Sequence, residues 1–152
     1  MSPDKTNTST TPTLQISVED IVAEARKWLG VRWIHQGRSA HGVDCAGMII
    51  KVGEALGAKS DDKTGYKRHP NAIEFLTHIR SQTDLADGPA PGRIAVFRQS
   101  KFPCHTGIFS EKDGVLHLIH SYIGTGKVIE EPFANHWPSL LVEVRTYRGR
   151  EV

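Results

Sequence analysis

The chain has 152 residues, with 19 Lys and Arg against 17 Asp and Glu, a formal net charge of +2, and two cysteines. This length suffices for one ordinary domain with a hydrophobic core, so neither disulfides nor a structural metal is needed to hold the fold. The near balance of charge, with no long block of one sign, argues against nucleic acid as a partner, and no apolar run approaches the roughly 20 residues that a membrane span requires.

The first sixteen residues, MSPDKTNTSTTPTLQI, are rich in Ser, Thr and Pro and lack the apolar segment of a secretory signal peptide. We expect residues 1–16 to be a flexible arm and residues 17–152 to form a single domain. Without an export signal, the protein is expected to be cytoplasmic at synthesis and to need a carrier if it acts elsewhere.

Three helices are predicted in the first half of the chain. The first follows Ser17, a good N-cap residue, and covers the amphipathic stretch SVEDIVAEARKWLG. A loop over residues 31–43 leads to Asp44, which can cap a second helix with Cys45 in its first turn. A third, shorter helix is predicted within PNAIEFLTHIR, residues 70–80, which has Pro at its start and apolar residues at helical spacing.

Beyond residue 92 the pattern changes to short runs of β-forming residues separated by turns. The runs are RIAVFR, HTGIFS, VLHLIHSY, KVIEEPF and LLVEVRTYR. Helices followed by strands predict an α+β domain, in which the N-terminal helices pack on a mostly antiparallel sheet of five to six strands.

Cys45 is a candidate nucleophile because of its predicted place in a first helical turn. The N–H groups and the dipole at this end of a helix favour the thiolate, which is the reactive form of cysteine. Cysteine is also among the most buried residue types and often only packs, so position alone leaves both interpretations open. A catalytic thiol additionally needs a base, and the base needs a third group to orient it.

Two histidines could supply these groups. His105 opens the HTGIFS strand and His120 lies late in VLHLIHSY, and the turn EKDG joins the two strands as in a hairpin. Neighbouring antiparallel strands can place two imidazoles side by side on one face. His120 shares its face with apolar residues, which suits an orienting group and equally suits an ordinary core histidine, whereas Cys104 is expected on the opposite side of its strand from His105.

The stretch WIHQGRSAHGVDCAGMI, followed by GYKRHP, PGRIAVFR, HTGIF and LIHSY, resembles the NlpC-type cysteine peptidases. These are compact papain-like enzymes that cut the peptide stems of the bacterial cell wall. The similarity extends over about residues 25–147 and is greatest to the branch found in phage tails and gene-transfer particles.

The resemblance implies a papain-like fold in which Cys45 is the nucleophile, His105 the general base and acid, and His120 the group that orients His105. The implied reaction is hydrolysis of an amide bond in peptidoglycan stem peptides, between D-glutamate and a diamino acid, through an acyl-enzyme and without a metal or other cofactor. The implied partners are those stem peptides and other phage-tail proteins, and the implied location is a virion tail or phage-like particle that acts on the cell wall.

Four further residues are weaker candidates for substrate binding or oxyanion stabilisation. Trp33 stands where many members of the family have a Tyr whose hydroxyl reaches toward the nucleophile; an indole N–H can donate but not accept, so the backbone N–H of Cys45 is the expected oxyanion donor. His35 can line a substrate groove, although exposed loop histidines more often have no specific role. Arg38, in the same loop, can meet a substrate carboxylate, although a solvated arginine is the simpler expectation. Asp44 is expected to cap the helix rather than act as an acid.

Two other functions use the same fold. A CHAP-like N-acetylmuramoyl amidase cuts between sugar and peptide, but its third catalytic position is commonly acidic or an amide, unlike His120. A non-catalytic tail adaptor leaves Cys45, His105 and His120 without an explanation. Zinc also accepts nitrogen and sulfur ligands, yet no short-range ligand pair accompanies these three residues.

Overall fold

The computed structural model describes residues 16–58, 72–99 and 102–149, except for the side chains of 72–75, 99 and 102–104. Residues 1–15 of the predicted arm therefore lie outside the described residues, as does the side chain of Cys104. Ile16, which the sequence analysis places at the end of the arm, packs against the hydrophobic core.

The three predicted helices are present: α1 (Val18–Arg26), α2 (Cys45–Ala55) and α3 (Ala72–Gln82). Ser17 caps α1 as predicted, since its hydroxyl accepts a hydrogen bond from the backbone N–H of Asp20 at 3.0 Å. The helix ends at Arg26, earlier than the sequence pattern suggests, and turns continue the chain to residue 30. A fourth helix, α4 (Trp137–Leu140), was not predicted.

Six strands form one sheet with the order β3-β8-β4-β5-β6-β7, and every neighbouring pair is antiparallel. The strands are β3 (Thr83–Leu85), β4 (Ile94–Gln99), β5 (Phe102–Lys112), β6 (Val115–Tyr122), β7 (Lys127–Pro132) and β8 (Leu141–Tyr147). Two short strands, β1 (Arg38–Ser39) and β2 (Gly42–Val43), form a separate hairpin in the segment predicted to be a loop. The predicted α+β fold, with helices on an antiparallel sheet of five to six strands, is confirmed.

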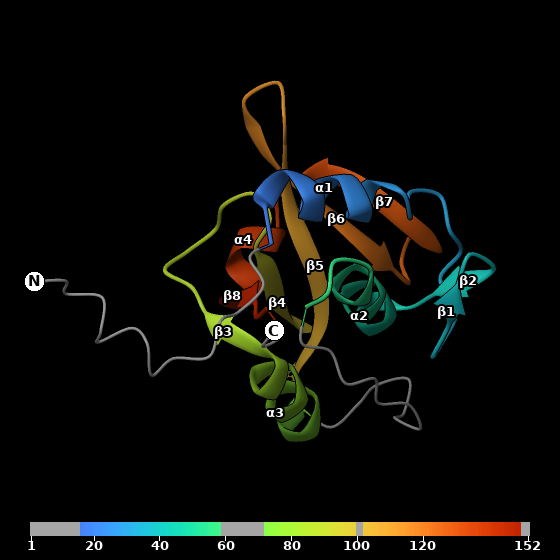
Figure 1. Cartoon of the computed structure of the whole chain (residues 1–152), viewed down its shortest axis with the longest axis horizontal. Coiled ribbons are helices and arrows are strands. Elements are labelled where there is room, and N and C mark those ends of the chain that lie inside the picture. Colours follow the sequence, from blue (N-terminus) through green and yellow to red (C-terminus); the bar gives the residue numbers. More distant parts are fainter. Residues whose placement is uncertain (1–15, 59–71, 100–101, 150–152) are drawn as a thin grey trace, which may run out of the picture.

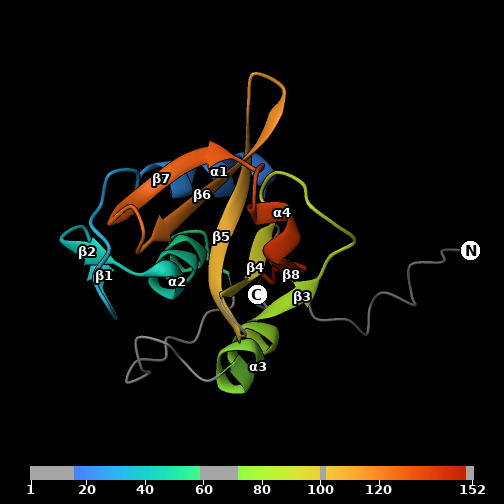
Figure 2. The same ribbon diagram turned by 180° about the vertical axis from the view of Figure 1, so that it is seen from behind.

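Helices cover the sheet on both faces (Figures 1 and 2), and each face has its own buried cluster. Helices α1 and α2 pack on one face, where the cluster contains Ile21, Ala25, Val43, Met48, Ile49, Val52, Ile94, Ile108, Ile119 and Val128. Helix α4 lies on the other face, where the cluster contains Ala95, Phe97, Phe109, Leu118, Trp137 and Val144. Alternation along the strands therefore decides which side chains meet α2 and which meet α4.

The β5–β6 hairpin fixes the register of the central strands. Its turn places Asp113 and Gly114 at φ values of 53° and 77°, the left-handed conformation that two-residue hairpin turns require. The register then pairs Ile108 with Ile119 and Phe109 with Leu118. The same register, continued away from the turn, places His105 and His120 on one face of the sheet as diagonal neighbours.

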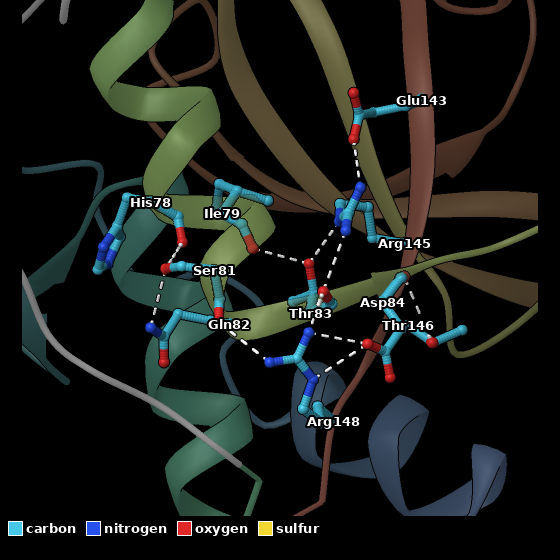
Figure 3. A network of polar contacts seen from close by, with 10 residues as sticks. All are labelled: His78, Ile79, Ser81, Gln82, Thr83, Asp84, Glu143, Arg145, Thr146 and Arg148. Atoms are coloured by element: carbon cyan, nitrogen blue, oxygen red, sulfur yellow. Dashed lines mark hydrogen bonds and ion pairs between the residues drawn. The ribbon is translucent and has the colours of Figure 1, made fainter.

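A polar network fastens the edge strand β3 to β8 (Figure 3). The buried guanidinium of Arg145 donates to Thr83 Oγ1 at 2.6 Å, to the Thr83 carbonyl at 3.0 Å and to a Glu143 carboxylate oxygen at 2.6 Å. Arg148 adds an ion pair with Asp84 at 2.8 Å. The Thr83 hydroxyl in turn donates to the Ile79 carbonyl, so the same network holds the end of α3.

Among the described residues, no helix is both long and apolar enough to cross a membrane.

Candidate active site

Cys45 is the first residue of α2 and is half-buried. Asp44 precedes it in extended conformation and caps the helix, as predicted, by accepting the backbone N–H of Gly47 at 2.7 Å. Its second carboxylate oxygen accepts the N–H of Gln36 at 2.8 Å. The buried carboxylate therefore holds the start of the helix and the preceding loop together, directly beside the candidate nucleophile.

Arg38 is not the solvated arginine that the sequence analysis favours. Its side chain is only 15% exposed, and Nη1 donates both to a carboxylate oxygen of Asp44 at 3.1 Å and to the Gly37 carbonyl at 2.9 Å. Gly47 explains how the loop can pack so closely, since a Cβ at this position would lie 2.5 Å from the Gly37 carbonyl oxygen. The ion pair between Arg38 and Asp44 fastens the loop to the first turn of α2.

His105 on β5 and His120 on β6 are in direct contact. Nε2 of His105 lies 2.7 Å from Nδ1 of His120, and both side chains are buried. Gly107, two residues after His105 on β5, makes room for this pair, because a Cβ there would lie 3.0 Å from His120 Cβ. Two ring nitrogens at this distance share one proton as donor and acceptor, so each imidazole restricts the orientation of the other.

The start of α2 is attached to the two strands next to these histidines. The hydroxyl of Thr106, which follows His105, donates to the backbone carbonyl of Cys45 at 3.1 Å. The hydroxyl of Ser121, which follows His120, donates to the carbonyl of Val43 at 2.6 Å. Each strand thus contributes one hydroxyl that holds the chain at the start of α2, and one imidazole one residue away.

Aromatic side chains enclose the histidine pair on the face that α4 covers. The ring centroid of His105 lies 5.8 Å from that of Phe97 and 5.4 Å from those of Tyr122 and Trp137. Burial in this shell, together with the charge of His120, holds the pKa of His105 well below its ordinary value. His105 is therefore neutral at neutral pH and able to accept a proton.

Glu131 on β7 extends the pair into a chain of three groups. One of its carboxylate oxygens lies 2.7 Å from Nε2 of His120. Burial lowers the pKa of His120, and the hydrogen bond and charge of Glu131 oppose that shift. Glu131 is not among the residues predicted from the sequence. Alternation in KVIEEPF can place Glu131 on one face of a strand, but only the register pairs it with Leu118, diagonal to His120.

The loop candidates Trp33 and His35 stack on each other, with ring centroids 6.5 Å apart. The backbone N–H of Trp33 donates to the Gly126 carbonyl at 2.8 Å, which fastens this loop to the β6–β7 turn. Both side chains are half-buried. Roles of Trp33 and His35 toward a substrate stay predictions.

The arrangement combines a cysteine at a helix start with an imidazole pair backed by a carboxylate, which is the composition needed for nucleophilic acyl transfer. In the part of the chain that the structure describes, no three His, Cys, Asp or Glu side chains gather as a metal ion would require.

No protein-family profile matches the sequence, and no curated protein matches it significantly. Solved structures do match. A lipoprotein-like member of the NLP/P60 family from Staphylococcus aureus subsp. aureus Mu50 gives a TM-score of 0.62 at 17% identity, over 96% of this chain and 47% of its own. An NlpC/P60 family protein from Bacillus cereus ATCC 10987 gives 0.65 at 19% identity, over 91% of this chain and 42% of its own.

The NlpC/p60 domain of the peptidoglycan hydrolase SagA is similar over 86% of this chain and 99% of its own, with a TM-score of 0.60 and 17% identity. The present chain thus spans less than half the length of the first two proteins and nearly the whole of this isolated domain. The described chain has the fold of the NlpC/P60 proteins.

Proposed function

We propose that this protein is a cysteine peptidase that hydrolyses amide bonds in the stem peptides of peptidoglycan. The observation that carries the proposal is the contact between His105 and His120, together with the hydrogen bond from Thr106, the residue after His105, to the carbonyl of Cys45 at the start of α2. The fold shared with the peptidoglycan hydrolase SagA supports the choice of cell-wall peptides as substrate.

In the proposed mechanism, the sulfur of Cys45 attacks the amide carbonyl carbon and its proton passes to His105. The resulting oxyanion accepts a hydrogen bond from the backbone N–H of Cys45, one of the N–H groups that point outward at a helix start. The C–N bond then breaks as His105 returns the proton to the leaving amine. Water, deprotonated by His105, attacks the thioester; the C–S bond breaks and the thiol is restored.

His120 has the role of a positioning residue in this mechanism. Since His105 uses Nε2 for its contact with His120, only Nδ1 is left to exchange protons with Cys45 and the leaving group. The fixed ring keeps that nitrogen in one direction through both halves of the reaction.

The proposal is tested by mass spectrometry of purified peptidoglycan after incubation with wild type, Cys45→Ala and Cys104→Ala. Wild type and Cys104→Ala should release the same fragments, and Cys45→Ala none. Fragments cut between D-glutamate and the diamino acid support the proposed bond, whereas fragments cut between sugar and peptide indicate an amidase. If none of the three proteins releases fragments although all are folded, the result favours a non-catalytic adaptor and contradicts the proposal.

We also propose that the protein acts on the cell wall from a phage or phage-like tail, with other tail proteins as partners. Similarity of the sequence around Cys45 to the phage-tail branch supports this location. Proteomic analysis of purified particles tests it: the protein should copurify with tail components, and its absence from intact particles would contradict the proposed location.

A further inference from the structure

Glu131 connects the solvent boundary to the buried histidine pair. Its side chain is 30% exposed, whereas that of His120 is fully buried, and the two meet at 2.7 Å. Glu131 pairs with Leu118 across β6 and β7, so it lies on the same face as His120 and diagonal to it. Its neighbour Glu130 pairs with Arg26 of α1 at 2.9 Å and accepts from Ser110 at 2.6 Å. The two adjacent carboxylates therefore act on different faces of the sheet.

The contacts restrict where protons can sit. An ionised carboxylate can only accept hydrogen bonds, so Nε2 of His120 must carry the proton that it shares with Glu131. A neutral imidazole has one N–H, which leaves Nδ1 of His120 as an acceptor. His105 must then donate from its own Nε2, because that atom lies 2.7 Å from Nδ1 of His120. A neutral His105 with Nε2 protonated has its lone pair on Nδ1.

We infer that Glu131 is a positioning residue that sets the tautomers of both histidines and so makes Nδ1 of His105 the basic nitrogen. The inference rests on the proposed role of His105 as the base for Cys45. Without the carboxylate, His120 can carry its proton on Nδ1 and donate it to His105. The proton of His105 then moves to Nδ1, and that nitrogen can no longer accept one from a thiol.

The groups around His105 and His120 leave Glu131 as the residue that sets the tautomers of the two rings. The rings packed around the imidazoles belong to Phe97, Tyr122 and Trp137, and burial among them opposes a positive charge. The exposed His136, next to α4, also disfavours a charge on His120. Of the charged groups that contact or act on His120 within the described chain, Glu131 is the acidic one. It also stabilises the imidazolium that forms on His105 during the reaction, through His120.

The test combines NMR of the histidine rings with kinetics, in wild type, Glu131→Gln and the matched control Glu130→Gln. Long-range ¹⁵N–¹H correlations of ¹⁵N-histidine-labelled protein at neutral pH report the tautomer of each ring without any substrate. Assignment uses His105→Asn and His120→Asn. Wild type should show both rings protonated on Nε2. Glu131→Gln should show a second tautomer, since an amide can donate as well as accept.

On the proposed substrate, Glu131→Gln should lower kcat about 10- to 100-fold, the size of loss typical when the partner that orients a metal-bound histidine is removed, with little change in KM. Glu130→Gln should leave the tautomers of both histidines unchanged and keep kcat within about twofold of that of the wild type. Nδ1-protonated His120 in wild type, or unchanged tautomers and kcat in Glu131→Gln, would overturn the inference. Because the NMR result needs no peptidoglycan, it stands even if the proposed substrate is wrong.

Discussion

Replacing Asp44 is expected to loosen the attachment of the loop to α2, because Gly47, Gln36 and Arg38 all bind this one buried carboxylate. Gly47 and Gln36 donate backbone N–H groups to it at 2.7 and 2.8 Å, and Arg38 pairs with it at 3.1 Å. Loss of an N-cap costs about 1 kcal/mol. A hydrogen bond to a charged group contributes roughly 1.5 kcal/mol or more, and both remaining partners lose one. Asp44→Ala should therefore lower the free energy of unfolding by about 4 kcal/mol.

Asp44→Asn separates the cap from the charge. The amide oxygen can still accept from Gly47, but the amide nitrogen then faces the N–H of Gln36, and the attraction to Arg38 is lost. The expected cost is about half as large, roughly 2 kcal/mol. Urea unfolding at neutral pH measures both variants, with an unchanged m-value as the sign that only stability has changed. A cost below about 1 kcal/mol for Asp44→Ala, or equal costs for both variants, would refute this reasoning.

Three further predictions concern the same region. Gly47→Ala should destabilise the protein by about 1–3 kcal/mol in urea unfolding, because its Cβ would meet a loop carbonyl at 2.5 Å, although helix propensity alone predicts a gain of about 1 kcal/mol. Burial lowers the pKa values of His105 and His120; the charge of His120 adds to this for His105, and the charge of His136 adds to it for His120. The unfolded chain therefore binds more protons than the folded one below about pH 6.5. The free energy of unfolding should therefore decrease as the pH is lowered through this range, by up to ~1.4 kcal/mol per pH unit for each histidine. If His105→Gln showed the same dependence of stability on pH as the wild type, His105 would not be its source. Thr106→Val keeps the shape of the side chain but removes the hydroxyl bonded to the Cys45 carbonyl. It should lower the free energy of unfolding by about 1 kcal/mol and kcat about fivefold. An unchanged kcat would show that this contact does not position the proposed nucleophile.

Periodicity and capping residues predict most of the fold. Ser17 and Asp44 cap helices as expected, and the turn with Asp113 and Gly114 sets the hairpin that carries both histidines. Helix α4 is missed because only four residues form it, too few for a helical pattern to be visible. Strand β3, with three residues, is shorter still and is held by tertiary contacts, including those of Arg145.

The candidate site is predictable where one element decides it and unpredictable where two must be brought into register. The first-turn position of Cys45 follows from the cap, and the shared face of His105 and His120 follows from alternation along a hairpin. Glu131 depends on the register of β6 with β7, which the sequence does not specify. Arg38 is buried against Asp44 because the loop folds back onto α2, a tertiary event without a local signal.

Direct detection of the acyl-enzyme tests the central claim, that Cys45 is the nucleophile. Wild type is mixed with a stem peptide, quenched in acid within the first turnovers, digested with trypsin and mapped by mass spectrometry. The two cysteines separate, since cleavage after Lys and Arg places Cys45 in the peptide 39–51 and Cys104 in 102–112. A thioester of the acyl fragment is expected on peptide 39–51 alone. Substrate turnover with an unmodified peptide 39–51, or with the acyl group on 102–112, would contradict it.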